Sequence, residues 1–210
     1  MQLTSIRTDI QRKGLYIGQR QLFLDFALSN IDTVKTAQGA GTPPKDYAPE
    51  ELLLAVKEEL KHKPQLIVLG GGEPLLQIAE LLPVLKEVPW PIPAGGGVPL
   101  CLETNATMPD RLAEIKPYVS LYALEYVADY QREFFDSLLL VKDAKVYVRA
   151  PVDKHTAPAD IDRLAKMLGA VRKDLPLVLE PVFGSKNYLS LQALALRHLQ
   201  SVRVIPPMHI

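Results

Sequence analysis

Charged side chains stand at or near the ends of three short apolar runs in the second half of the chain. Glu125 ends the run 121–125, Arg149 lies in the run 146–150, and Glu180 ends the run 177–180. A charge at the end of a buried strand is unfavourable unless it is paired or hydrated. We interpret the three as catalytic candidates in a polar pocket, where two carboxylates in different surroundings could act as acid and base. The alternative is an internal ion-pair network that also includes Glu103.

A glycine turn is the second candidate site. Gly71 and Gly72 follow the apolar run 66–69 and precede Glu73 and Pro74. Glycines directly after a strand let the backbone turn tightly and approach a ligand closely. Backbone carbonyls of this turn and the Glu73 carboxylate could therefore accept hydrogen bonds from an ammonium group.

Short apolar runs alternate with amphipathic segments along the whole chain, which predicts parallel strand–helix units. Continuous apolar strands are typical of a covered parallel sheet. Six units and a last short strand are too few for a closed eight-stranded barrel. The sequence predicts an α/β fold, a partial (β/α)6 TIM-like barrel forming a single domain over 1–210, with a flat doubly wound sheet as the alternative. Working residues of such barrels lie at the carboxyl ends of the strands. We expect strands at 21–26, 66–69, 100–103, 121–125, 146–150, 177–180 and 202–205, and helices at 49–61, 75–87, 109–116, 130–140, 158–169 and 189–200.

Composition restricts the possible partners and surroundings of the protein. The 210 residues include 24 Lys or Arg and 24 Asp or Glu, and this balance argues against a nucleic-acid partner. The sequence has neither an apolar run long enough for a membrane span nor a secretory signal, so we expect no membrane partner and a cytoplasmic location. Its one cysteine, Cys101, lies in an apolar run and is expected to be a core residue.

Several motifs in order along the chain resemble those of the radical S-adenosylmethionine (SAM) enzymes. They are Gly-Gln-Arg-Gln-Leu-Phe at 18–23, Gly-Gly-Glu-Pro-Leu-Leu-Gln at 71–77, Leu-Glu-Thr-Asn-Ala-Thr at 102–107, Pro-Leu-Val-Leu-Glu-Pro-Val at 176–182 and Val-Arg-Val-Ile-Pro at 202–206. The branch that they resemble contains the pyruvate formate-lyase activating enzymes and the 7-carboxy-7-deazaguanine synthases. This resemblance implies a partial barrel whose glycine turn holds the methionine amine of SAM. The cofactor-binding residues that it implies are Gly71, Gly72, Glu73, Pro74, Glu103 and Asn105. Gly70 departs from the family, which usually has Thr or Ser there.

The cluster loop departs further from the family. Radical SAM enzymes bind a 4Fe-4S cluster through three cysteines spaced C-x3-C-x2-C, and the matching positions here are Ser29, Thr33 and Thr36. Hydroxyls are hard ligands that stay protonated near neutral pH, whereas the cluster needs thiolates. We therefore expect no 4Fe-4S cluster. The loop is interpreted as an ordinary polar loop, with a Mg²⁺ site built from Asp25, Asp32 and hydroxyls as the alternative.

Three functional hypotheses follow. The first is a pseudoenzyme that has lost radical chemistry, binds SAM or a related nucleoside, and has a regulatory role or a role beside a partner protein. The second is a non-radical, Mg-dependent enzyme that uses Glu125, Arg149 and Glu180. The third is an active radical SAM activase or 7-carboxy-7-deazaguanine synthase-like enzyme that borrows cluster ligands from a partner chain. His209 is the one histidine expected near the pocket.

Overall fold

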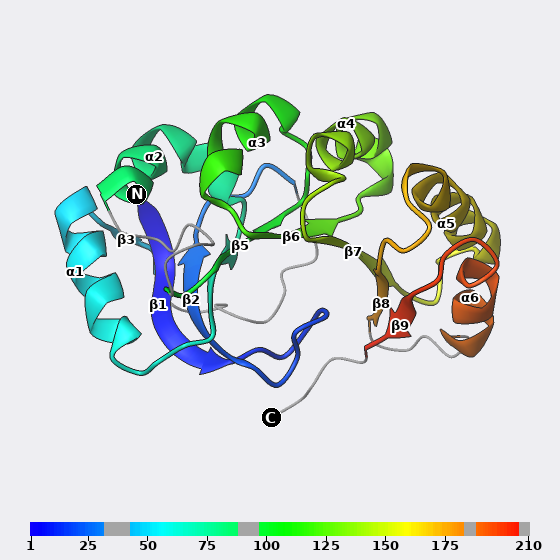
Figure 1. The fold of residues 1–210 in the computed structure, drawn as a ribbon, viewed down its shortest axis with the longest axis horizontal. Coiled ribbons are helices and arrows are strands. Elements are labelled where there is room, and N and C mark those ends of the chain that lie inside the picture. Colours follow the sequence, from blue (N-terminus) through cyan, green and yellow to red (C-terminus); the bar gives the residue numbers. More distant parts are fainter. Residues whose placement is uncertain (32–42, 88–96, 183–187, 206–210) are drawn as a thin grey trace. The chain divides into compact units, whose positions relative to one another are not determined.

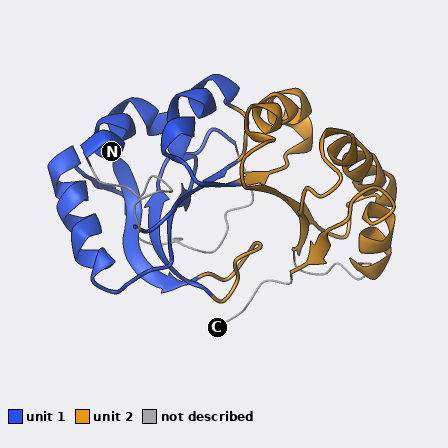
Figure 2. Ribbon diagram, in the orientation of Figure 1, with its two compact units in different colours: residues 1–10, 19–104, 108–122 blue, residues 11–18, 105–107, 123–210 orange. Residues whose placement is uncertain are grey.

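Figure 1 shows the computed structural model, which describes residues 1–31, 43–87, 97–182 and 188–205. The chain divides into two compact units (Figure 2). Unit 1 comprises Met1–Ile10, Gln19–Thr104 and Met108–Tyr122, and unit 2 comprises Gln11–Gly18, Asn105–Thr107 and Ala123–Ile210. The single domain expected from the sequence stays a prediction.

Unit 1 is built on a sheet with both parallel and antiparallel strand pairs. Its strand order is β3-β1-β2-β4-β5. Strand β1 pairs antiparallel with β2 and β3, while the pairs β2–β4 and β4–β5 are parallel. The bounds are β1 (Gln2–Ile10), β2 (Arg20–Phe26), β3 (Lys45–Asp46), β4 (Leu66–Gly71) and β5 (Leu100–Thr104). The parallel strands were predicted, whereas β1 and β3 were not.

Three α-helices cover one face of the unit 1 strands (Figure 1). They are α1 (Pro49–Leu60), α2 (Ile78–Glu87) and α3 (Pro109–Ile115), with 3-10 turns η1 (Pro74–Gln77) and η2 (Lys116–Tyr118). The helix expected at 75–87 therefore begins as a 3-10 turn. Leu22, Leu24, Leu69 and Leu102 of the strands are at most 1% exposed, so the apolar core lies along these strands.

Strands and helices also alternate along the chain in unit 2. Strand β6 (Leu121–Glu125) starts in unit 1 and ends in unit 2, and the parallel strands β7 (Val146–Val152), β8 (Leu177–Pro181) and β9 (Val202–Val204) follow in that order. The helices are η3 (Ala128–Tyr130), α4 (Gln131–Val141), α5 (Pro158–Val171) and α6 (Tyr188–Ala195). Helices α4, α5 and α6 again lie on one side of their strands (Figure 1). One-sided cover within each unit favours the barrel type over a doubly wound sheet, which carries helices on both faces.

Two predicted helix ends in unit 2 were wrong. Helix α5 runs to Val171 instead of ending at Gly169. A Cβ atom at Gly169 would lie 2.6 Å from the carbonyl oxygen of His198, so this glycine permits close packing within a helix. Helix α6 ends at Ala195, because the chain then tightens into turns in which the amide of His198 donates to the Ala195 carbonyl at 3.1 Å.

None of the helices in the described ranges combines the length and the apolar character that crossing a bilayer requires.

Candidate functional site

The glycine turn at the end of β4 packs directly on the chain that leaves β2. Gly71 has φ +86°, and a Cβ atom there would lie 2.8 Å from backbone atoms of Phe26. A Cβ atom at Gly72 would lie 2.1 Å from the Leu28 carbonyl oxygen. The amide of Gly72 donates to the Phe26 carbonyl at 2.7 Å, and the amide of Glu73 donates to the Leu28 carbonyl at 2.6 Å. Both glycines are thus needed for the close approach of two backbone segments of the protein itself.

The Glu73 carboxylate ties this turn to the neighbouring strand. Its side chain caps η1 by accepting a hydrogen bond from the Leu75 amide at 3.1 Å. The Thr104 hydroxyl at the end of β5 donates to both carboxylate oxygens at 2.9 Å. Glu73 is 0% exposed, as expected for a buried carboxylate that has hydrogen-bond donors. Glu73 is therefore an acceptor, as expected, and these two donors belong to the protein. That it also holds an ammonium group stays a prediction.

Two further residues of the same motif are buried. Pro74 forms the first position of η1. The side chain of Gln77 accepts from the Gln2 amide at 2.6 Å and donates to the Gln2 carbonyl at 3.1 Å. This double hydrogen bond imitates a strand pairing and fixes the start of β1. No local pattern in the sequence indicates this role of Gln77, because its partner lies 75 positions away.

Glu103 and Asn105 follow each other closely in sequence and belong to different units. Glu103 of β5 is 7% exposed, and one of its carboxylate oxygens lies 3.4 Å from the place of a Cβ atom at Gly70. The side-chain oxygen of Asn105 accepts from the Thr107 amide at 3.2 Å and from the Thr107 hydroxyl at 2.7 Å. Asn105 therefore shapes the turn after β5, and Glu103 lies beside the glycine turn. That the six residues bind one cofactor together stays a prediction.

Of the three positions that match the cluster cysteines, only Ser29 is described. Its hydroxyl donates to the Ile31 carbonyl at 2.7 Å and accepts from the Ile31 amide at 3.3 Å, so it forms part of a local turn. Thr33 and Thr36 lie outside the described residues, as do Asp32 and His209. Cys101 is 2% exposed within β5, as expected for a core residue.

The donor set does not fit a 4Fe-4S cluster. Serine and threonine hydroxyls replace the thiolates, and the one thiol of the chain is buried in β5. Asp25, suggested for Mg²⁺, pairs with the guanidinium of Arg7 and accepts from the Ser5 hydroxyl at 2.6 Å. Within the described ranges, no group of three or more His, Cys, Asp or Glu residues is arranged to hold a metal ion.

The three catalytic candidates meet in unit 2. The Arg149 guanidinium donates to Glu180 through Nε at 3.0 Å and through Nη2 at 2.7 Å. The same Nη2 lies 3.3 Å from a carboxylate oxygen of Glu125. Glu180 also accepts from the amide of Gly14 at 3.0 Å. The sequence predicted that these side chains cluster, and it offered no sign that Gly14 joins them.

This arrangement matches the ion-pair alternative for the three residues of unit 2. Arg149 is 4% exposed, and one permanently charged guanidinium holds both carboxylates. Glu103 belongs to unit 1, so its predicted place in the network stays a prediction. The contacts fasten the Gly14 loop and the ends of β6 and β8 to β7. Acid–base chemistry by these residues likewise stays a prediction.

Comparison with known proteins points to the same enzymes that the sequence motifs resemble. No protein-family model matches the chain. The 7-carboxy-7-deazaguanine synthase of Geobacter sulfurreducens is 26% identical over 250 residues, covering 99% of this chain and 95% of the relative. That of Archaeoglobus fulgidus is 28% identical over 232 residues, covering 99% and 96%. The chain is a relative of the 7-carboxy-7-deazaguanine synthases. The resemblance to this branch of the radical SAM superfamily is thereby confirmed.

The fold of the 7-carboxy-7-deazaguanine synthases is also matched in three dimensions. The crystal structure of QueE from Escherichia coli superposes with a TM-score of 0.65 at 16% sequence identity, over 99% of this chain and 94% of that one. The prediction from the sequence, an α/β fold of the partial (β/α)6 barrel type, is confirmed.

Proposed function

We propose that this relative of the 7-carboxy-7-deazaguanine synthases has lost iron–sulfur radical chemistry and acts as a pseudoenzyme. The observation that carries the proposal is Ser29, which stands at a cluster cysteine position and whose hydroxyl closes a turn with Ile31. A serine hydroxyl in such a turn is not an iron ligand of the kind that a 4Fe-4S cluster uses. Cys101 cannot compensate, because one thiol supplies one ligand and this thiol is buried in β5.

The pseudoenzyme is proposed to bind SAM or a related nucleoside at the carboxyl ends of β4 and β5. Three features of unit 1 support this. The glycine turn is held in a defined conformation by Phe26 and Leu28, Glu73 anchors it to β5, and the Glu103 carboxylate lies beside Gly70. A ligand-dependent regulatory role, exerted through a partner protein, fits a scaffold that lacks its cluster ligands.

Calorimetric titration of the metal-free protein with SAM, and with S-adenosylhomocysteine for comparison, tests ligand binding. We expect saturable binding that weakens about tenfold in Glu103→Gln, because this change removes a charge and keeps the shape of the side chain. Glu114→Gln is the matched control, since Glu114 is exposed on α3. Absence of binding to the wild-type protein would refute the ligand part of the proposal.

Anaerobic reconstitution with iron and sulfide tests the loss of radical chemistry. We expect no stoichiometric cluster in the isolated chain. A cluster that forms and is reduced in the presence of SAM would overturn the pseudoenzyme proposal. A cluster that forms only after a partner chain is added would support borrowed ligands instead.

A further inference from the structure

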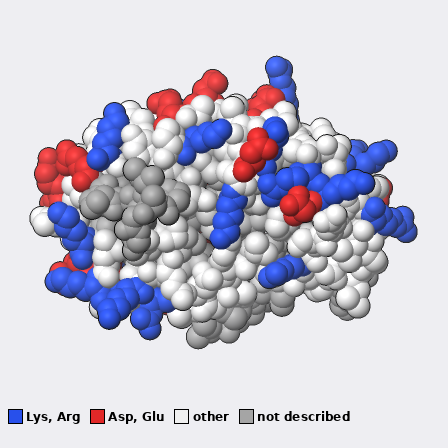
Figure 3. Space-filling model, in the orientation of Figure 1, with Lys and Arg blue, Asp and Glu red and all other residues white. Residues whose placement is uncertain are grey.

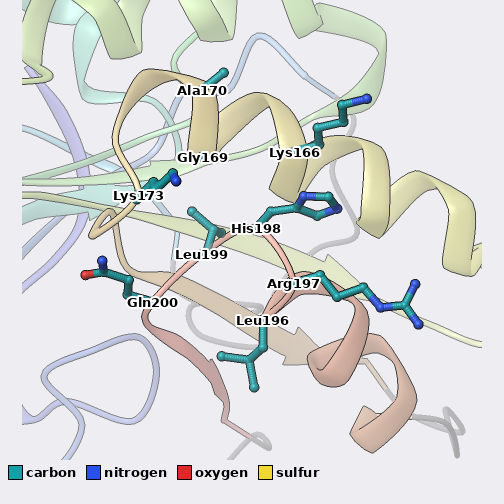
Figure 4. Close-up of a pocket in the computed structure, with 9 residues that line it drawn as sticks. All are labelled: Lys166, Gly169, Ala170, Lys173, Leu196, Arg197, His198, Leu199 and Gln200. Carbon is teal, nitrogen blue, oxygen red and sulfur yellow. The ribbon is translucent and has the colours of Figure 1, made fainter.

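A basic groove lies in unit 2, and none of the residues of the Glu125–Arg149–Glu180 cluster is among those that line it. It has a volume of about 450 Å³ and lies between the last turns of α5, the segment after α5, and the turns that join α6 to β9 (Figure 4). Its side chains include Lys166, Lys173, Leu196, Arg197, His198 and Gln200. Among the described residues that line it there is no carboxylate.

The lysines and the arginine of this groove lack the carboxylate partners that several other cations of the unit have. Lys166, Lys173 and Arg197 are exposed, and none of them forms an ion pair within the described part of the chain. Four other exposed or half-buried cations of unit 2 do have a carboxylate partner, whereas the exposed Lys145, Lys154 and Arg203 form no ion pair within the described residues. The four pairs are Arg132–Asp136, Lys142–Asp143, Arg163–Asp160 and Arg172–Asp174. On the face that Figure 3 shows, Lys and Arg also predominate over the helices of this unit. The groove is therefore a local positive surface on a chain with zero net charge.

The floor of the groove is held firmly. Gly169 packs against the His198 carbonyl, and Nε2 of His198 lies 3.0 Å from Oδ1 of Asp162 on α5. The amide of Gln200 donates to the Lys173 carbonyl at 2.9 Å. These contacts fix the turn after α6 on α5, so the groove exists before any partner binds, which lowers the entropic cost of binding.

An apolar surface continues from the groove along α6. Leu196 lines the groove and is 47% exposed, and Leu189 on α6 is 81% exposed. The amide of Leu196 donates to the Gln192 carbonyl at 2.9 Å, so this residue continues the helical geometry by one position. Residues seven apart on a helix share a face, so the two leucines form one apolar stripe that leads to the cations.

We propose that this groove and stripe dock an acidic segment of a partner protein. Its carboxylates would face Lys166, Lys173 and Arg197, and its apolar side chains would cover Leu196 and Leu189. A small anion such as phosphate needs donors that converge on one point, whereas the cationic ends in Figure 4 stand apart around the hollow. The biological meaning of the site rests on the partner role proposed above, but the charge and shape of the groove do not.

Fluorescence anisotropy with a short labelled peptide of glutamates interrupted by leucines tests this inference. We expect saturable binding at low ionic strength that weakens as salt screens the charges. Reversing the groove charges in Lys166→Glu/Lys173→Glu/Arg197→Glu should weaken binding at least about tenfold. The matched control is Lys57→Glu/Lys86→Glu/Lys154→Glu, which changes the net charge equally at exposed positions outside the groove and should keep the wild-type affinity.

Several results would overturn the inference. They are no saturable binding to the wild-type protein, equal loss of binding in both triple variants, and displacement of the peptide by an equal concentration of inorganic phosphate. Tighter binding of an oligothymidylate of the same charge would point to nucleic acid instead. Because the peptide is titrated in the absence of SAM, the outcome is independent of nucleoside binding.

Discussion

Replacing Arg149 by methionine separates the two interpretations of the Glu125–Arg149–Glu180 cluster. Methionine keeps most of the apolar stem and removes the guanidinium that holds both carboxylates. The side chains of Arg149, Glu180 and Glu125 are 5%, 15% and 22% exposed, so the two glutamates would keep only limited access to water. Breaking a buried ion pair from one side lowers the free energy of unfolding by about 3–5 kcal/mol in general. We expect a loss near the lower end, about 3 kcal/mol, because the glutamates are partly hydrated.

The companion variant Glu125→Gln/Arg149→Met/Glu180→Gln removes all three charges together. It should recover more than half of the lost stability, since no member of the cluster is left as an uncompensated charge and the new side-chain amide oxygen at position 180 can still accept from the Gly14 amide. Urea unfolding measures the free energy of each variant, and an unchanged slope with denaturant shows that the unfolding reaction is the same. Arg163→Met is the control, because the exposed pair Arg163–Asp160 should contribute at most about 0.5 kcal/mol. A loss below about 1 kcal/mol in Arg149→Met would refute the structural network and favour a hydrated pocket.

Two further predictions concern unit 1 and its boundary. Gly72→Ala should lower the free energy of unfolding by at least about 2 kcal/mol, because its Cβ atom would lie 2.1 Å from the Leu28 carbonyl oxygen. The control is Gly18→Ala, which should lower it by only about 1 kcal/mol, because Gly18 has φ +86° but nothing within 4 Å of its Cβ position. Equal losses of the two variants in urea unfolding would contradict this prediction. Burial raises the pKa of Tyr122 from 10.0 to about 12, so the neutral phenol is favoured in the folded state. Its contribution to the free energy of unfolding is complete below pH 10 and is lost as the pH rises through 12. The wild-type protein should therefore lose about 2–3 kcal/mol from this group between pH 10 and pH 12, and Tyr122→Phe should not. Parallel pH profiles for the two proteins would show that this tyrosine does not titrate as expected.

The parallel strands could be predicted because they are buried on both faces and therefore apolar along their length, as in β4 and β5. Strand β1 lacks such a run. Its residues are mostly half-buried, it pairs antiparallel, and a shift of register between Leu3 and Ser5 interrupts any alternation of apolar and polar side chains. The sequence of β1 therefore shows neither a continuous apolar run nor a regular alternation, which are the two patterns that predict a strand. Helix ends were missed for a similar reason, because the carbonyl of His198 that determines the role of Gly169 is distant in sequence.

The candidate site shows what a motif can and cannot indicate. The sequence predicted that Gly71 and Gly72 permit a close approach, and the structure shows one. What approaches is the backbone at Phe26 and Leu28, and sequence alone could not distinguish it from a ligand. Likewise, the polar strand ends predicted a cluster of charges. That the single guanidinium of Arg149 contacts both glutamates follows only from the three-dimensional structure.

Three residues that match the radical SAM motif share one property: each has a structural partner within the protein. Gly72 contacts Leu28, Glu73 binds Thr104, and Gln77 holds the start of β1. A cluster cysteine contributes mainly to the cofactor, so a serine at position 29 is compatible with an intact fold. Folding stability alone is therefore sufficient to retain the glycine turn, with or without a bound nucleoside. For this reason a change at Glu73 would confuse ligand binding with folding, and Glu103→Gln, which leaves the Glu73–Thr104 contact in place, is the more informative variant for testing SAM binding.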